Sequence, residues 1–281
     1  MTATTVHSTA PPRWRMLGRS WLRSALATVL LLLLLGTAWE VAKILSGSAD
    51  TLMPHSWQIL GHLTEKTTAG QTQFAYVAGE WLVTLRNSAL GFLVGATLGL
   101  VLGVVIVYNR LVGGALYPLA VLAQTVPIVA IAPALVLWMG TGATAKVVVA
   151  AYLTFFPVTV ATVKGIQSVT PQGLDLMRIC AARPHEVLLK LQLPAALPMI
   201  FVGLETAAGV AVVGAIVAEL PFGSDSGLGL VILTSWQFYS IQPESLYVAV
   251  LASCLLGIVA VAVVRMMRSV IPAANEPTEA I

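Results

Sequence analysis

The stretch LDLMRICAARPHEVLLKLQLPAALP, residues 174–198, is rich in charge, although the segments on either side of it are long and apolar. Its charged side chains crowd into the part before the closing Leu-Pro pairs, and they are Asp175, Arg178, Arg183, Glu186 and Lys190. The whole chain is only 10% charged and 58% hydrophobic, whereas a soluble domain is roughly a quarter charged. A compact charged segment in such a chain predicts a loop that leaves the membrane between two spans.

The apolar runs around this loop predict an all-α integral membrane protein with about six transmembrane helices. A helix rises about 1.5 Å per residue, so it needs about 20 apolar residues to cross the hydrocarbon. The expected spans lie near residues 24–45, 87–108, 117–139, 146–163, 195–218 and 245–264. The expected organisation is a tail at 1–23, a first span at 24–45, a linker at 46–82, a core with five spans at 83–268, and a tail at 269–281. The core contains the charged loop at 170–194.

The distribution of Lys and Arg predicts the orientation in the membrane. With the N-terminus in the cytoplasm, eleven of the 15 Lys and Arg residues fall in cytoplasmic segments or at their edges. Positive residues are enriched on the cytoplasmic side of membrane proteins. Both termini and the charged loop are therefore expected in the cytoplasm, and the linker 46–82 is expected outside. The net charge of +3 reflects this anchoring and predicts no nucleic-acid partner.

Four glycines at a spacing of four lie in the second expected span: Gly91, Gly95, Gly99 and Gly103. They share one helix face, and each costs about 1 kcal/mol of helix propensity in water. Close approach of a neighbouring helix is the interpretation that we favour. The alternative is that membrane helices simply tolerate glycine.

Other polar residues in the spans are candidates for a transport pathway. Gln124 and Thr125 precede Pro127 in the third span, where a proline kink frees backbone carbonyls that need partners. Glu205 and Glu219 lie within and at the end of the fifth span, and an intramembrane acid is a functional candidate. Helix packing is the alternative for the proline region. For Glu205 the alternatives are a place at the inner interface or a bond to a neighbouring helix.

Two further charges, Glu40 and Lys43, lie three residues apart in the first span and are expected to pair on one helix face.

The sequence lacks the motifs of several enzyme classes. The segment GTGATAK at 140–146 is not a phosphate-binding P-loop, and neither an HExxH nor a GxSxG motif occurs. No catalytic residue and no metal ligand is therefore predicted, and the remaining classes are transporters, channels and membrane scaffolds.

The charged loop contains signals for two short helices that meet at a corner. Thr170 is a candidate N-cap and Pro171 suits the first helical position, so one helix is expected to run to about Cys180. Pro184 can start a second helix, and Pro194 is expected to end it. The loop also carries more apolar side chains than a solvated loop needs: Leu174, Leu176, Met177, Ile179, Leu188 and Leu189. An apolar patch with charges at its edge is typical of a site for a partner protein, and folding back on the membrane helices is the alternative.

At these residues the chain resembles the permeases of ABC importers. The loop is similar to their EAA loop, the cytoplasmic element that docks into a groove of the ATPase subunit. In that pattern Asp175 stands at the glutamate position, Ala181 at the glycine position and Leu188 at the hydrophobic anchor, and Leu193-Pro194 closes the motif. The coupling residues that the resemblance implies are Leu174, Asp175, Met177, Arg178, Ala181, Ala182, Leu188, Leu193 and Pro194. Alanine in place of glycine counts against a corner that needs a positive φ at residue 181.

The resemblance covers roughly residues 80–265 and is closest to the nitrate/sulfonate/taurine branch, which includes importers of thiamine-pyrimidine precursors and riboflavin. It rests on VPIVAIAPALVLWMGTGATAKVVVAAYLTFFPV at 126–158, AVVGAIVAEL at 211–220 and SGLG at 226–229. It implies the type I importer fold and a permease pair, expected to be a homodimer. It also implies a separate ATPase that binds ATP, an external binding protein, no cofactor in this chain and a place in the bacterial plasma (inner) membrane, among lipids. The alternatives are a proton-coupled secondary transporter that uses Glu205 or Glu219, and a structural scaffold.

Overall fold

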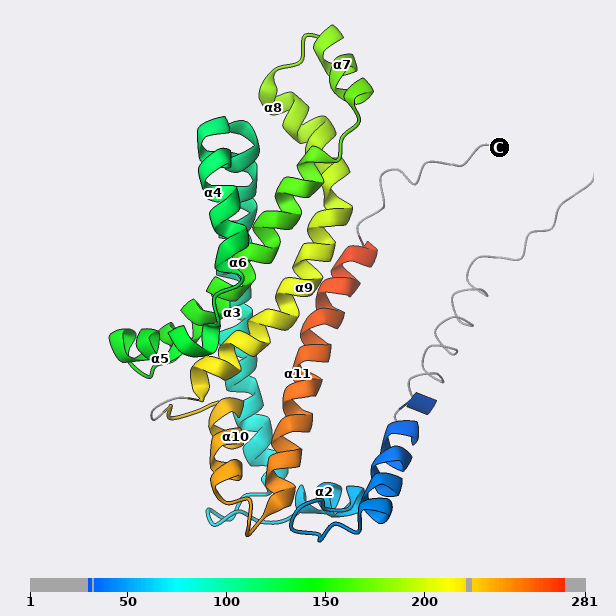
Figure 1. Ribbon diagram of the computed structural model, residues 1–281, viewed down its shortest axis with the longest axis vertical. Helices are drawn as coiled ribbons and strands as arrows, with labels where there is room; N and C mark the ends of the chain where they lie inside the picture. The colour runs from blue at the N-terminus through cyan, green and yellow to red at the C-terminus, as the bar shows by residue number, and fades with distance from the viewer. Residues whose placement is uncertain (1–29, 32, 221–223, 271–281) are drawn as a thin grey trace, which may run out of the picture.

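The computed structural model describes residues 30–31, 33–220 and 224–270, and these are almost entirely helical. The helices, in chain order, are a helix over 33–46, with residues 30–31 also helical, α2 (Ser56–His62), α3 (Gln73–Tyr108), α4 (Arg110–Ala123), α5 (Ile128–Met139), α6 (Ala143–Gln167), α7 (Pro171–Ile179), α8 (Pro184–Val187), the π-helical turn η1 (Leu188–Gln192), α9 (Leu193–Glu219), α10 (Leu228–Gln237) and α11 (Pro243–Val270). The long helices run side by side, with α7 at one end of the molecule and α2 at the other (Figure 1).

Four helical stretches of the described chain are long and apolar enough to cross a membrane: α3, α6, Pro184–Glu219 and α11. They contain four of the six predicted spans. The predicted span at 117–139 is not one straight helix: Gly113–Ala123 and Ile128–Met139 are bent by 99° at the break between them, so this part of the chain is a broken span or a re-entrant loop. Pro127 is the N-cap of α5, so the chain starts a new helix there and does not merely kink. The predicted first span begins outside the described residues, which enter it at residue 30.

The bundle is centred on α6, which packs against both α3 and α9. In the most apolar 18-residue stretch of α6, 56% of the residues are buried, compared with only 22% in that of α11. The four glycines of α3 are all buried against α6, as the packing interpretation predicts. A Cβ on Gly99 would lie 2.7 Å from the Phe155 carbonyl oxygen, and one on Gly103 would lie 2.6 Å from Cβ of Thr162. Any larger residue would force the two helices apart.

Close approach through glycine recurs where α9 packs against α6, which the sequence does not indicate. On α9, a Cβ on Gly203 would collide with Cβ of Ala161, and one on Gly214 would lie 2.9 Å from Cα of Ala150. These glycines are eleven residues apart, so they lack the regular spacing of the α3 row. Small residues therefore allow close packing of α6 against both α3 and α9.

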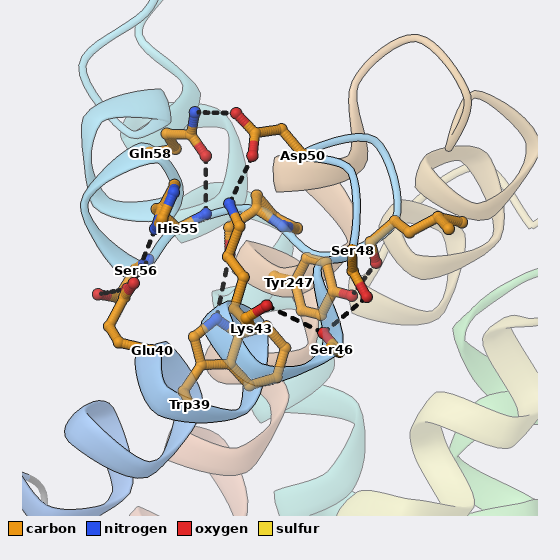
Figure 2. A network of polar contacts seen from close by, with 12 residues as sticks. Trp39, Glu40, Lys43, Ser46, Ser48, Asp50, His55, Ser56, Gln58 and Tyr247 are labelled. Carbon is orange, nitrogen blue, oxygen red and sulfur yellow. Dashed lines mark hydrogen bonds and ion pairs between the residues drawn. The ribbon is translucent and has the colours of Figure 1, made fainter.

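The predicted pair between Glu40 and Lys43 is wrong, because each charge has a partner in the loop at residues 47–55 (Figure 2). Glu40 accepts a hydrogen bond from the Ser56 backbone N–H at 2.7 Å, and its other oxygen lies 2.7 Å from Nδ1 of His55. Lys43 donates to Asp50 at 2.6 Å, and this bond lowers the pKa of the Asp50 carboxyl. The chain folds back at residues 47–55, which brings these groups closer than the helical neighbour.

The same loop is bound by hydrogen bonds to α11 and to the segment that precedes α11. The Trp39 indole donates to the Pro54 carbonyl at 3.0 Å and meets the ring of Tyr247 edge-on at 5.3 Å. The hydroxyls of Tyr239 and Tyr247 both donate to the Leu52 carbonyl, at 2.7 and 3.1 Å. The predicted linker 46–82 is thus an ordered segment, which contains α2 and the start of α3.

Candidate functional site

The candidate site is the α7–α8 corner, which joins α6 to α9 at one end of the molecule (Figure 1). Helix α7 begins as the sequence predicts: Thr170 is the N-cap, its hydroxyl accepts from the Gly173 N–H at 3.4 Å, and Pro171 occupies the first turn. All nine residues of α7 are exposed or half-buried. A helix of this length is marginal in water without packing, so its capped ends are what keep it short and defined.

Ala181 forms the corner itself, with φ at +49°. The N–H of Ala181 donates to the Arg178 carbonyl at 2.9 Å, and that of Ala182 donates to the Met177 carbonyl at 3.0 Å. These two bonds make a Schellman motif, which normally has glycine at the left-handed position. The expectation of a corner without a positive φ is therefore wrong. The loop keeps the backbone shape that glycine would favour and carries a strained alanine there, at a cost of roughly 1–2 kcal/mol.

The second half of the corner is held by hydrogen bonds to the Glu186 side chain. Glu186 accepts a hydrogen bond from the Arg183 backbone N–H at 2.9 Å and one from Lys190 at 3.0 Å. The Arg183 N–H, followed by Lys190, lowers the pKa of the Glu186 carboxyl. The prediction that Pro194 ends this helix is wrong: the chain stays helical from Pro184 to Glu219, and Pro194 lies in the first turn of α9. Between α8 and α9 the chain forms the π-helical turn η1, whose backbone bonds run from residue i to i−5, so the helix continues up to Pro194 without the usual i−4 bonds.

The apolar side chains of the corner divide into two groups. Leu176 and Ile179 on α7 are 61% and 83% exposed, and Leu189 is 59% exposed. By contrast, Leu188 and Leu193 pack against a buried cluster of Ile166, Ala196 and Ile200. Leu174 and Met177 are half-buried, whereas Asp175 and Arg178 are exposed and paired at 2.8 Å. The side chains available to another protein are therefore those of α7, with Leu189, rather than the anchor position that the motif spacing indicates.

A second polar cluster, which the sequence did not predict as a unit, surrounds Glu219 at the far end of α9. The Glu219 side chain is fully buried, and its Oε2 accepts from the Thr84 hydroxyl at 2.8 Å and the Gly229 N–H at 3.1 Å. A Cβ on Gly227 or on Gly229 would collide with this glutamate. The glycines of SGLG are thus required by a carboxylate eight to ten residues earlier, and that spacing is the signal that could have revealed the cluster.

Residues 95–270 match the family of binding-protein-dependent transport system inner membrane components. The chain belongs to this family. It lies in the branch of the nitrate, sulfonate and taurine permeases of ABC transporters.

Individual relatives of this permease agree with the family. It is 40% identical over 151 residues to an ABC transporter permease protein of Haemophilus influenzae, covering 54% of this chain and 61% of the relative. It is 30% identical to the aliphatic sulfonates permease SsuC of Bacillus subtilis, over 82% of this chain and 80% of the relative. It is also 30% identical to the formylaminopyrimidine permease ThiX of Halalkalibacterium halodurans, over 88% and 95%.

A solved structure supports the fold. The permease aligns with a chain of the MetNI methionine ABC transporter in an inward-facing conformation, with a TM-score of 0.54 and 17% identity. The alignment covers 69% of this chain and 97% of that one. This likeness establishes the type I importer fold of the permease.

The predicted pathway residues do not come together within the single permease chain. Gln124, Thr125 and Pro127 are exposed at the bend between α4 and α5. Glu205 is bound to α11 by Arg265 and Arg268, each at 3.4 Å, and Glu219 is buried as described. Cavities of about 420 and 520 Å³ lie near α2 and the starts of α3 and α11, and none of these five residues lines either one.

Proposed function

We propose that this chain is the permease subunit of an ATP-driven importer, which forms the pathway for a small nutrient delivered by an external binding protein. The observation that carries the proposal is the α7–α8 corner: a capped, charged loop between two long apolar helices, whose own apolar side chains point away from the bundle. Exposed apolar residues with charges at their edge fit a protein partner better than they fit water.

The partner that fits is the ATPase of the importer, on the cytoplasmic side of the bacterial inner membrane. Leu176 and Ile179 are the side chains that we propose to enter its groove, with Asp175 and Arg178 at the rim. We propose the same side of the membrane for both termini of the permease. ATP is bound by the ATPase, and the permease carries no cofactor of its own.

The continuity of Pro184–Glu219 supports a mechanism for coupling. A movement of the docked corner is passed directly into a span that packs along α6, because no flexible linker separates the two. A second copy of the permease completes the pathway, and the residues at the α4–α5 bend are the candidates to line it. The substrate that we propose is a small organic nutrient, of the sulfonate or pyrimidine kind for which relatives are named.

Proton coupling through the two acids is the less favoured function. The Glu205 carboxylate already has two arginine partners, and the Glu219 carboxylate is enclosed by groups of α3 and α10. Neither acid lines the cavities of about 420 and 520 Å³ near α2 and the starts of α3 and α11.

The test combines a double substitution, Leu176→Ser with Ile179→Ser, with co-purification of the ATPase and uptake in vesicles. Loss of a buried apolar anchor costs about 2 kcal/mol or more, so we expect at least a 30-fold weaker complex and no uptake. The control is Leu60→Ser on α2, a similarly exposed leucine at the opposite end. Full ATPase binding by the double variant would remove the main support for the proposal.

A further inference from the structure

The end of α11 nearest the α7 side carries two arginines at the edge of the membrane. Glu244 and Arg265 enclose 20 uncharged residues, which span about 30 Å as a helix, the thickness of the hydrocarbon. Arg268 follows three residues later and lies on the same face. Exposed apolar side chains surround the pair on α11: Val263, Met266 and Met267 are 51%, 62% and 57% exposed. The two guanidinium groups therefore lie at the depth of the lipid headgroups, beside a surface that faces acyl chains.

Among the residues that the structure describes, the charges at this place do not balance. The carboxylate of Glu205 on α9 lies between two guanidinium groups, so these three side chains together carry one positive charge. Each oxygen accepts from one arginine at 3.4 Å, longer than the roughly 2.7–2.9 Å of a strong charge-assisted bond. The Glu205 side chain is 15% exposed, whereas those of Arg265 and Arg268 are 72% and 46% exposed. A guanidinium has five N–H donors, so most of the donors of the pair still point outward.

We infer that Arg265 and Arg268 form a binding site for the phosphate of an anionic phospholipid, in the leaflet on the α7 side, with Glu205 as an internal competitor. A phosphodiester group matches the forked donors of a guanidinium, and its acyl chains lie along Val263 and Met266. The phosphate takes up the donors that Glu205 leaves free. Glu205 links α9 to α11 and sets how strongly the arginines hold the lipid.

The experiment measures lipid binding to the purified full chain by native mass spectrometry. Phosphatidylglycerol is titrated against phosphatidylcholine with the same acyl chains. Each of Arg265→Gln and Arg268→Gln should weaken binding of phosphatidylglycerol about fivefold, as expected for one basic residue near a membrane surface, and leave phosphatidylcholine unchanged. Glu205→Gln should strengthen binding of phosphatidylglycerol several-fold, because it removes the competing anion.

The matched control is Arg86→Gln, which removes a single exposed arginine of α3 and should leave lipid binding unchanged. Excess inorganic phosphate should not displace the lipid, since the acyl chains contribute to its affinity. Equal binding of the two lipids, displacement by free phosphate, or weaker binding in Glu205→Gln would each overturn the inference. None of these outcomes depends on transport, so they leave the proposed function to its own test.

Discussion

The α3–α6 interface and the α7–α8 corner both contain small and apolar residues. Within the chain, only those of the α3–α6 interface are covered by a neighbouring helix. Along α3, four glycines face α6 so closely that a single added carbon would meet backbone or Cβ atoms. Along α7, Leu176 and Ile179 face outward. An apolar or small-residue pattern thus indicates a contact surface in both regions. Whether the contact lies within the chain or with another chain depends on which neighbour the fold provides.

The largest expected effect is at the α3–α6 interface, which is covered within the chain. Gly95→Leu places a side chain against the Ala151 backbone of α6, and we expect destabilisation of about 3 kcal/mol or more and loss of the folded chain from membranes. Gly79→Leu is the control on the same helix, because a Cβ there meets nothing within 4 Å. Accumulation and thermal unfolding of the two variants are compared. Equal stability would mean that α3 and α6 are not held by this contact.

A smaller but still large effect is expected at Glu219. Glu219→Ala leaves the buried Gly229 N–H without its acceptor and leaves the Thr84 hydroxyl only the Glu80 carbonyl at 3.3 Å, at a cost of about 2–3 kcal/mol. Glu219→Gln keeps an acceptor oxygen and should lose less stability. Thermal unfolding of the detergent-purified variants measures the difference. If alanine is tolerated as well as glutamine, the carboxylate does not hold α10 to α3.

Two neighbouring leucines mark the boundary between the packed bundle and the exposed surface of the corner. Leu188→Ala should destabilise the chain by about 1–2 kcal/mol, because this side chain packs beside Ile166 and Ile200. Leu189→Ala should leave stability unchanged, because it is 59% exposed. Unfolding is measured without the ATPase. The reverse order of the two effects would contradict the assignment of Leu188 to the bundle.

The corner offers a stabilising change. Ala181→Gly relieves an alanine at a φ of +49°, and we expect about 1 kcal/mol of added stability in the loop, seen as slower amide exchange over α7. Ala182→Gly is the control, since its φ is not positive and it gains nothing. Faster exchange in Ala181→Gly would show that the alanine side chain contributes more than the strain costs.

The smallest effect is expected at the rim of the corner. Arg178→Ala removes an exposed pair with Asp175, and such pairs contribute little, so ATPase binding should change less than about twofold. Ile179→Ala on the adjacent position should weaken it far more. A loss with Arg178→Ala as large as that with Ile179→Ala would mean that charge, not apolar contact, holds the partner.

Much of the fold follows from local features of the sequence. Apolar length predicts α3, α6, α9 and α11, and the regular glycine spacing predicts the packed face of α3. Thr170 and Pro171 predict the start of α7 correctly, because a cap depends only on residues within one turn. The break at Pro127 was expected only as a kink, since the 99° bend depends on how α5 packs against α6 and α9.

The sequence predicts where in the chain the candidate site lies, but not which of its side chains face outward. The motif spacing indicated Leu188 as the outward anchor, but in the fold it joins the buried cluster around Ile166. The regular row on α3 was visible in the sequence, whereas Gly203 and Gly214 on α9 were not. The five candidate pathway residues share polarity or a proline kink, a property that does not place them at one surface.

The sequence by itself determined that this chain is a helical membrane protein with a docking-type loop between two spans, because hydrophobic length, capping and charge are properties of short segments. Only the tertiary structure decided the partners of Glu40, Lys43 and Glu219, the direction of Leu188 and the positive φ of Ala181. The physical reason is that each of these depends on atoms that the fold brings together or on a turn closed by several hydrogen bonds at once. A side chain bonds to the nearest suitable group in space, which is often far away along the chain.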